Sequence, residues 1–461
     1  MDAATMPTER SAREAEEFLA AHPDVGNIQV ILTDADGVAR GKSLRRNELA
    51  RIYTHGRYLP GSILGLDITG ADVEEAGLLW GDGDADRVCW PVPGTLTRSP
   101  WQTPAAGQVL VSMHELDGAP SPGDPRHALR RVVDRFAEIK LTPVIAVELE
   151  FYLLDRALAH DGSRQPPASP VSGHRPRHLQ ANLLTDLDDQ APFLADVFAA
   201  CETQALPAQT LISEYAPGQF EIVLHHRADA LRAADDAIMY KRLVRGVAAR
   251  HGMEATFMAK PYADRSGSGM HLHMSLQDAG GGNAFASDDP QGNALLRHAI
   301  GGMAATMGES VGIFAPNANS YRRFRRNSYA PTAPTWGVNN RSVSLRVPAG
   351  PAETRHVEHR VAGADANPYL AAAALLAGAH HGIVDKIDPG PPVEGNGYAQ
   401  AAATLPTNWY AAMDRMESSA FLKDYLGTRF MEIYGAIKRA EQDRFYAQVT
   451  ELDFDWYLRN A

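Results

Sequence analysis

Cysteine is almost absent from this chain of 461 residues, since only Cys89 and Cys201 occur and they lie far apart. Two cysteines so widely separated exclude a disulfide framework and a zinc ribbon, and they favour a reducing compartment. A long apolar run is also missing. The most apolar stretch, residues 369–384, is rich in alanine and contains two histidines, so it is too short and too weak to span a bilayer.

Positive charge is scarce as well. Lys and Arg total 44 against 56 for Asp and Glu, which gives a net charge of −12. A general nucleic-acid binder needs a positive surface, so this balance argues against nucleic acid as a partner. The N-terminal segment has acidic residues and no apolar signal-peptide core, so we expect a cytoplasmic protein that does not act at a membrane. The overall composition is that of a globular enzyme.

The pattern along the chain indicates two domains with a boundary near residue 120. Residues 11–21 predict a short helix, and residues 27–44 predict a hairpin with its turn at Asp34–Gly37. The cluster 121–125 predicts a helix capped by Asp124 with Pro125 in the first position. Beyond it strands and helices alternate: strands are expected at 144–154, 212–224, 255–261, 270–276 and 342–348, and helices at 192–205, 229–251 and through most of the chain from about 365.

Two glutamates, Glu148 and Glu150, share one face of the expected strand 144–154, because residues two apart in a strand point the same way. Neighbouring carboxylates repel each other unless a cation lies between them. A second acidic pair, Glu214 and Glu221, flanks a Pro-Gly turn that could bring the two side chains together. A solvated strand face and an ordinary polar hairpin end remain the alternatives for these pairs.

Histidines show the same alternation in the sequence GSGMHLHMS at 267–275. His271, His273 and Ser275 share a strand face, and the glycines before them allow a ligand to approach the backbone closely. A lone histidine is usually structural, but two on one face beside a glycine-rich loop make a ligand role about as plausible.

Arginines gather in three later segments, 319–326, 340–346 and 355–360. Arginine binds phosphate and carboxylate groups in a bidentate manner. A solvated basic face is the simpler reading for Arg325 and Arg326, but it does not readily explain three such segments in an acidic protein. Glutamates with an imidazole suit Mg²⁺ or Mn²⁺, and arginines with a divalent ion suit phosphoryl transfer. The sequence has no Walker A motif and no kinase signature set.

The order of these motifs, ELE, SEYAPGQFE, GSGMHLH, NSYRR, NRSVSLR and EHR with ADANPYL, resembles the glutamine synthetase family over nearly the whole chain. The resemblance implies an α+β protein with a small N-terminal β-grasp domain, residues 1–120. A catalytic α/β domain with an antiparallel active-site sheet and a helical C-terminal region follows at 121–461. It implies a homo-oligomer, usually a double-ring dodecamer with sites between subunits.

The same resemblance implies ATP-dependent phosphorylation of the γ-carboxylate of glutamate, followed by attack of an amine on the γ-glutamyl phosphate. It implies one divalent-metal site formed by Glu150, Glu214 and Glu221 and a second formed by Glu148, His271 and Glu358. The other implied roles are glutamate binding by Gly267, Arg323 and Arg360, nucleotide binding by His273 and Ser275, and stabilisation of the transferring phosphoryl group by the ATP-binding, catalytic pair Arg341 and Arg346.

Two departures from the family pattern bear on the acceptor. Pro60 and Tyr329 stand where ammonia-using members carry acidic residues. With the DxxGxxRGK hairpin, they make the chain most similar to the γ-glutamylpolyamine synthetase branch, so we expect an organic amine such as putrescine. The acidic loop Asp82, Asp84 and Asp86 could receive a distal ammonium, or could simply be solvated. An ordinary glutamate–ammonia ligase and a catalytically silent structural homologue are the alternatives.

Overall fold

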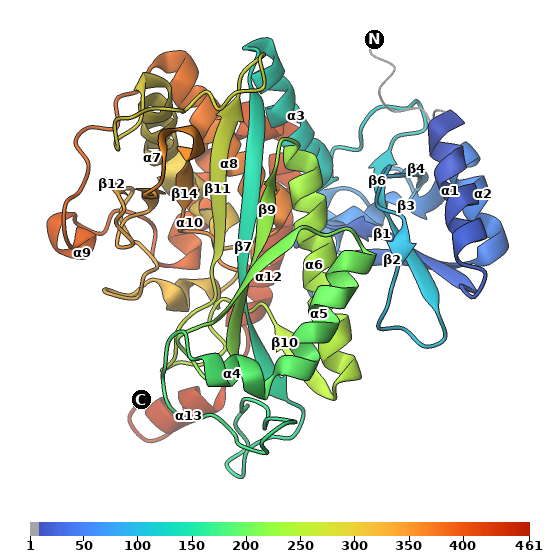
Figure 1. The fold of residues 1–461 in the computed structure, drawn as a ribbon, viewed down its shortest axis with the longest axis horizontal. Helices are drawn as coiled ribbons and strands as arrows, with labels where there is room; N and C mark the ends of the chain where they lie inside the picture. The colour runs from blue at the N-terminus through green and yellow to red at the C-terminus, as the bar shows by residue number, and fades with distance from the viewer. Residues whose placement is uncertain (1–8) are drawn as a thin grey trace.

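Two β-sheets organise the molecule. The smaller sheet is formed by β1–β6 in the N-terminal part, and the larger sheet is formed by β7–β14 in the part that follows. The computed structural model describes residues 9–461. Figure 1 shows the smaller sheet in blue at the right of the view, beside a larger sheet that runs through the centre and is surrounded by helices. A β-rich N-terminal part is thus followed by a catalytic part with a large, mostly antiparallel sheet, and the predicted α+β architecture is confirmed.

The N-terminal part is built on a mixed sheet. Its elements are α1 (Glu9–Ala21), β1 (Asn27–Thr33), β2 (Ala39–Arg45), α2 (Leu49–His55), β3 (Arg57–Pro60), β4 (Asp86–Pro91), β5 (Thr97–Arg98) and β6 (Ala106–His114). Among the described residues the strand order is β2-β1-β6-β4-β3, with β5 also paired to β6. The predicted hairpin is confirmed, because β1 and β2 pair antiparallel around the turn at Asp34–Gly37.

The catalytic part begins with α3 (Pro125–Glu138), whose N-cap is Asp124 as predicted. Its strands are β7 (Thr142–Asp155), β8 (Ala208–Ser213), β9 (Gln219–Arg227), β10 (Met253–Thr256), β11 (Met270–Gln277), β12 (Trp336–Val338), β13 (Leu345–Val347) and β14 (Val357–His359). The order of the described sheet is β12-β13-β14-β11-β7-β9-β8, with β10 added to one end of β7. Only β12 and β13 pair in parallel among these strands.

Helices cover and extend this sheet. They are α4 (Leu184–Asp189), α5 (Ala191–Thr203), α6 (Ala230–Arg250), α7 (Ala294–Phe314), α8 (Pro368–Asp385), α9 (Gly397–Gln400), α10 (Trp409–Ser418), α11 (Ala420–Leu426), α12 (Thr428–Tyr446) and α13 (Glu451–Tyr457). Helix α6 packs on β7, β9 and β10, and α8 packs on α3, α6 and α7. The predicted helices at 192–205, 229–251 and beyond 365 are confirmed.

Helix α7 was not predicted, and the reason is its burial. Most of its surface is covered, so its sequence has no alternation of apolar and polar residues to indicate a helix. The pair Gly301–Gly302, which would normally weaken a helix, allows α7 to approach α8 closely. A Cβ atom at Gly302 would lie 2.2 Å from the carbonyl oxygen of Gly378, and one at Gly382 would lie 2.1 Å from that of His298.

Two expected strands are shorter than predicted. The strand expected at 255–261 ends at Thr256. Its partner strand β7 pairs with β10 only through its last four residues, from Tyr152 to Asp155. The strand expected at 342–348 is reduced to β13, because Asn340 accepts a hydrogen bond from the Ser342 backbone nitrogen at 2.9 Å and holds that segment in a turn. Along this segment Val343, Leu345 and Val347 are buried, so alternate residues still face the core.

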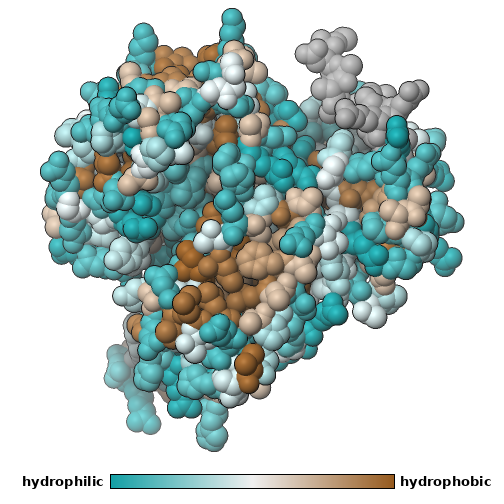
Figure 2. Space-filling view, viewed as in Figure 1, coloured by the Kyte–Doolittle hydropathy of each residue, from teal (hydrophilic) through white to brown (hydrophobic). Residues whose placement is uncertain are grey.

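The surface of the molecule shows one apolar area and no sign of a membrane-spanning helix among the described residues. In the described part of the chain no helix is long and apolar enough to cross a membrane. Figure 2 shows a continuous apolar area near the middle of one face, where Figure 1 places α5 in front of the large sheet. The expectation about the N-terminal segment falls partly on residues 1–8, which lie outside the described residues. The domain boundary near residue 120 stays a prediction.

A buried ion network joins the N-terminal hairpin to the C-terminal helices. The Lys438 ammonium on α12 contacts the carboxylate of Asp36 in the hairpin turn and that of Glu441, the latter at 2.8 Å. Asn367, the N-cap of α8, donates to the backbone oxygens of Asp34 and Ala35 at 3.0 and 3.2 Å. The hairpin turn is therefore fixed to the catalytic part.

Replacing Lys438 with methionine is expected to lower the free energy of unfolding by about 3–5 kcal/mol, because two buried carboxylates lose their cation. The deficit should shrink from pH 8 to pH 5, since unpaired buried carboxyl groups take up protons. Denaturant unfolding of wild type and K438M at both pH values measures this. K42M, which alters an exposed lysine of β2, should change stability by less than about 0.5 kcal/mol. An equally small effect of K438M would contradict the prediction.

Candidate active site

Strand register brings the predicted acidic residues and histidines into one row. Glu148 on β7 lies opposite His271 on β11, and Glu150 lies opposite Glu221 on β9. His273 on β11 lies opposite Glu358 on β14. Because side chains opposite each other in antiparallel strands stand on the same face, β14, β11, β7 and β9 present these groups side by side.

Glu148 is at the centre of the row. Its carboxylate contacts His271 Nδ1 at 2.7 Å and His273 Nε2 at 3.3 Å. Burial alone would raise the pKa of Glu148, but the hydrogen bonds from the two imidazoles outweigh it and hold that pKa well below its usual range. The ligand atoms fall into two compact groups, Glu148 with Glu221 and His271, and Glu148 with His273 and Glu358, and within each group they lie within 4.8 Å of one another.

The remaining carboxylates repel each other. Burial and the charges of the neighbouring glutamates raise the pKa of Glu221 to about 11. Burial and the charge of Glu214 raise the pKa of Glu150 to about 8, although Glu150 accepts hydrogen bonds from the Gly269 backbone nitrogen at 3.0 Å and from Gln219 at 3.1 Å. Burial, followed by the charge of Glu148, raises the pKa of Glu214.

This donor set fits divalent metal ions. Four glutamates in a shared, mostly buried space with raised or strongly perturbed pKa values form a cluster that a divalent cation would neutralise. Oxygen ligands with one or two imidazoles suit Mg²⁺ or Mn²⁺. The geometry groups His273 with the possible ligands, whereas the sequence analysis assigned it to the nucleotide. Glu150 and Glu214 lie outside the two compact groups, so the assignment of ligands to two separate metals stays a prediction.

Arginines flank the row at the Glu358 end. Glu358 pairs with Arg360 and, at 2.9 Å, with Arg346. Although burial would raise the pKa of Glu358, the positive charges around it, that of Arg360 first, lower that pKa to about 2. Arg325 and Arg326 are exposed, as the solvated-face reading expected.

Arg323 lies buried at the other side of the glycine-rich segment. It ends the 3-10 helix Ser320–Arg323 and donates to the Val361 backbone oxygen at 3.1 Å. A Cβ atom at Gly267 would lie 2.6 Å from Arg323 Cγ, so glycine at this position allows the two predicted glutamate-binding residues to pack together. Ser275 is half-buried farther along β11, opposite Val144 and outside both compact groups.

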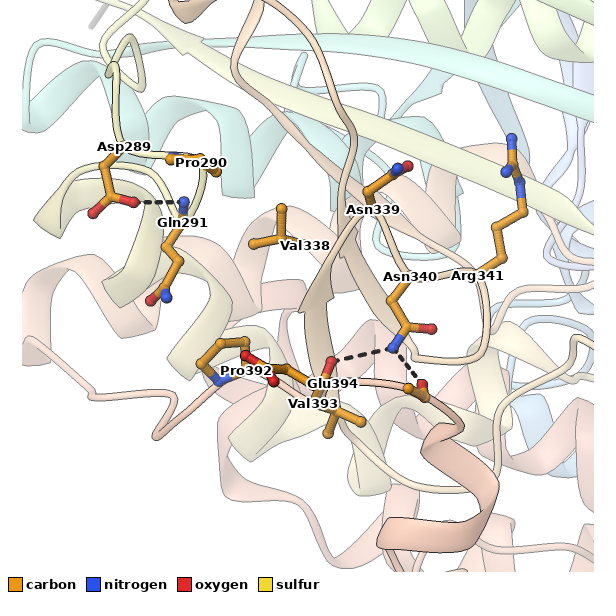
Figure 3. A pocket seen from close by; sticks show the side chains of 11 residues that line it. Asp289, Pro290, Gln291, Val338, Asn339, Asn340, Arg341, Pro392, Val393 and Glu394 are labelled. Atoms are coloured by element: carbon orange, nitrogen blue, oxygen red, sulfur yellow. Dashed lines mark hydrogen bonds between the residues drawn. The ribbon is translucent and has the colours of Figure 1, made fainter.

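A cavity of about 580 Å³ lies beside β12 and is lined by residues 289–291, 338–341 and 392–395; none of the residues of the row lines it. Figure 3 shows the Arg341 side chain at its wall, with Asn339 and Asn340 beside it. Asn339 accepts a hydrogen bond from Arg346 at 3.1 Å, and Arg346 in turn holds Glu358. An anion in this cavity would therefore meet a guanidinium close to the possible metal ligands.

The sequence analysis did not single out Gln219, which positions two of the predicted residues. Gln219 donates both to Glu150 and, at 3.0 Å, to the backbone oxygen of Gly267. Its position two residues before Glu221, on the same strand face, was the available signal. His356 contacts His273 at 3.2 Å, and only the strand arrangement indicates that pairing.

The two positions that lack a carboxylate lie on exposed or half-exposed segments. Pro60 ends β3 opposite Asp86. Tyr329 has 60% of its surface exposed and a backbone φ of 58°. In the acidic loop, Asp82 is paired with Arg87 at 2.7 Å, whereas among the described residues Asp86 pairs with no cation. Asp84 also forms no ion pair in the described part of the chain, but Asp86 is the loop acid that lies opposite Pro60.

Comparison with known proteins identifies a family model and several similar proteins. A family model described as "Glutamine synthetase, catalytic domain" matches residues 122–457. "Gamma-glutamylputrescine synthetase PuuA" of Escherichia coli (strain K12) is 42% identical over 449 residues, which cover 97% of this chain and 95% of that protein. "Glutamate--isopropylamine ligase" of a Pseudomonas species is 33% identical over 96% of both chains. A solved structure of a GmaS/ADP complex superposes with a TM-score of 0.82 at 28% identity, covering 97% of this chain and 99% of that one.

Proposed function

This chain belongs to the glutamine synthetase family, and from that premise we propose that it joins the γ-carboxylate of glutamate to an organic amine, with a diamine such as putrescine as the best acceptor. The general reaction, ATP-dependent ligation of a γ-glutamyl group to an amine with divalent metals, is that of the family. The observation that carries the choice of acceptor is the 42% identity over almost the full chain to a γ-glutamylputrescine synthetase, together with Pro60 and Tyr329 at the two acceptor positions.

Each group of residues has a role in this proposal. The two compact groups around Glu148 would hold divalent ions, which when bound would supply positive charge against the phosphates of ATP and the γ-carboxylate of glutamate. Arg323 and Arg360, which are both buried, bind the carboxylates of glutamate. They can do so because protein carboxylates compensate their positive charges only in part. Arg341 and Arg346 stabilise the phosphoryl group as it moves to glutamate and gives γ-glutamyl phosphate. The amine then attacks that acyl phosphate and releases phosphate. Assembly into a double-ring dodecamer stays a prediction.

The acceptor preference follows from charge and apolar contact. Ammonium and a protonated alkylamine must both lose a proton before they attack, but ammonium is a compact cation whose binding depends on carboxylates around the acceptor pocket. Pro60 and Tyr329 offer no carboxylate. An aliphatic amine instead gains free energy from contact between its chain and such apolar surfaces, at about 0.8 kcal/mol for each buried methylene. The free carboxylate of Asp86, opposite Pro60, would attract the distal ammonium of a diamine.

We expect kcat/KM for putrescine to exceed that for ammonium by at least about tenfold, or about 1.4 kcal/mol. Phosphate release is measured at fixed ATP and glutamate with ammonium, propylamine, putrescine and ethanolamine, and the amide product is identified by mass. D86N should raise KM for putrescine while leaving KM for propylamine unchanged.

A panel in which ammonium is the best acceptor would reduce the proposal to an ordinary glutamate–ammonia ligase. Absence of turnover with every amine would favour a silent homologue, although the retained Glu and His groups argue against that reading.

A further inference from the structure

A second cavity, of about 820 Å³, lies where the N-terminal hairpin, α6 and α12 meet. None of the residues assigned above to metal, glutamate or nucleotide lines it. Much of its wall is apolar: the buried rings of Phe257 and Trp409 contribute to it, and so do the half-exposed side chains of Ile68, Met258 and Phe445. A concave, mostly apolar space of this size with a few charged groups is typical of a small-molecule site.

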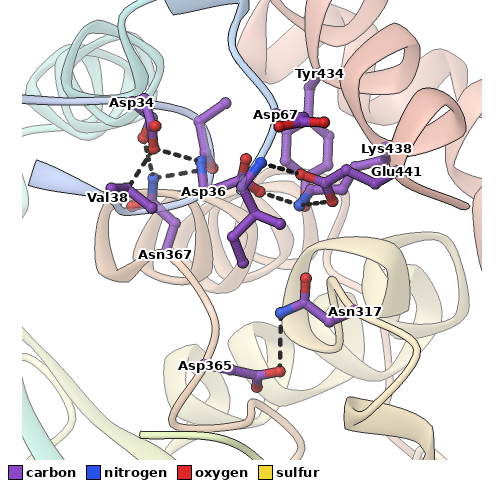
Figure 4. A network of polar contacts seen from close by, with 12 residues as sticks. Asp34, Asp36, Val38, Asp67, Asn317, Asp365, Asn367, Tyr434, Lys438 and Glu441 are labelled. Carbon is purple, nitrogen blue, oxygen red and sulfur yellow. Dashed lines mark hydrogen bonds and ion pairs between the residues drawn. The ribbon is translucent and has the colours of Figure 1, made fainter. Parts of the chain in front are cut away.

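Three of the four acidic groups that line this cavity already have cationic partners. Figure 4 shows that Asp36 and Glu441 share the Lys438 ammonium. Asp67 pairs with Arg444 and also accepts hydrogen bonds from Thr69. These three carboxylates are therefore paired within the protein itself, whereas Asp365 forms no ion pair in the described part of the chain.

Two of the three basic groups that line the cavity form no ion pair in the described part of the chain; the third, Arg444, pairs with Asp67. Lys241 and Arg245 lie one turn apart on α6, and both line the space. The Lys241 ammonium donates only to backbone oxygens, of Ala364 at 2.8 Å and of Ala366 at 3.4 Å. Within residues 9–461 Arg245 forms no ion pair or hydrogen bond, and its Cζ atom lies 5.1 Å from the centre of the Phe257 ring.

The environment of these two cations is electrostatically unfavourable. Burial lowers the pKa of Lys241 to about 7 and lowers the pKa of Arg245 as well. Asp365 also lines the cavity: one of its oxygens accepts hydrogen bonds from Asn317 at 3.1 Å and from Ser320 at 2.5 Å, and its charge partly offsets the effect of burial on the pKa of Lys241. Lys241 is buried, whereas the side chain of Arg245 is exposed to solvent, so an incoming anion would relieve the unfavourable burial of the Lys241 charge and could pair with the accessible Arg245 guanidinium.

We propose that this cavity binds a small amphipathic carboxylate, whose anionic group pairs with Arg245 and Lys241 and whose apolar body packs against Phe257 and Trp409. A guanidinium binds a carboxylate through two parallel hydrogen bonds, so Arg245 is the main determinant of charge selectivity. The apolar wall selects ligands that carry a hydrocarbon chain or a ring.

Ligand binding here is coupled to glutamate binding through one short segment. Asn317 and Asp365 line the cavity, and Asp365 holds Ser320, the first residue of the 3-10 helix that ends at Arg323. A ligand that contacts these residues shifts the position of the Arg323 guanidinium and with it the KM for glutamate. This coupling, unlike the binding itself, rests on the proposed function.

Isothermal titration of the full-length protein with hexanoate and with phenylacetate, each compared with its neutral amide, tests the binding. We expect at least one carboxylate to bind at least tenfold more tightly than its amide, and R245Q to lose at least tenfold in that affinity. The matched control R250Q alters an arginine at the end of the same helix that donates to the Pro100 backbone oxygen, and it should bind as wild type does. Absence of binding up to about 10 mM, equal affinity for acid and amide, or wild-type affinity of R245Q would overturn the proposal.

The coupling is tested separately by steady-state kinetics. The carboxylate that binds should change KM for glutamate at least threefold in wild type and in R250Q, and should not do so in R245Q. An unchanged KM with the ligand bound would overturn the coupling. Since the titration requires no turnover, its outcome does not depend on which amine the enzyme uses.

Discussion

Replacing Glu148 with glutamine is expected to reduce turnover by at least about a thousandfold, or about 4.1 kcal/mol of transition-state stabilisation. Glu148 is the carboxylate shared by both compact ligand groups, and its two oxygens contact both His271 and His273. The substitution keeps the shape of the side chain but removes the charge on which the affinity for a divalent ion depends. Phosphate release at saturating Mg²⁺ or Mn²⁺ measures the effect.

Metal affinity distinguishes this role from a purely structural one. Mn²⁺ titration should give at least tenfold weaker binding for E148Q, while its thermal unfolding stays close to that of wild type. E254Q is the matched control, because Glu254 is an exposed glutamate of β10 that pairs with Arg164 on the surface. If E148Q retained more than about a tenth of wild-type turnover, the assignment of Glu148 as a metal ligand would be wrong.

The faces of single strands could be predicted from the sequence, because alternation is a local property. Glu148 and Glu150 do share a face of β7, and His271 and His273 share a face of β11. Which residues lie opposite each other depends on tertiary pairing, which no short pattern encodes. The contacts of Glu148 with two imidazoles, and of His273 with His356, could therefore be found only in the structure.

Burial hid other features from the sequence. Helix α7 is apolar on nearly every side and thus has no helical periodicity, so the main packing partner of α8 was missed. Lys438 looks like an ordinary surface lysine of a helix, although its ammonium is fully buried between Asp36 and Glu441. The lack of an anionic partner for Arg245 likewise depends on segments that lie far apart in the chain. Sequence motifs thus indicated the chemistry of the site. The contacts that join the N-terminal hairpin to the C-terminal helices could be found only in the three-dimensional structure.

Replacing Arg341 with alanine is expected to lower kcat at least about a hundredfold, or about 2.7 kcal/mol, while KM for ATP changes less than about fivefold. Arg323 and Arg360 are buried and fixed, but Arg341 is exposed at the wall of the 580 Å³ cavity and pairs with no carboxylate in the described part of the chain. A guanidinium so placed gains most when phosphoryl charge develops beside it, which makes its interaction stronger in the transition state than with bound ATP.

Three variants separate this role from loss of charge alone. R341K keeps the positive charge but loses the bidentate geometry, so its kcat should lie between those of wild type and R341A. R164A removes an exposed arginine far from the cavity and should leave kcat unchanged. Steady-state kinetics with ATP varied at saturating glutamate and amine gives kcat and KM for each variant. An effect of R341A confined to KM for ATP would mean that Arg341 binds the nucleotide equally in ground and transition states, and its catalytic role would have to be abandoned.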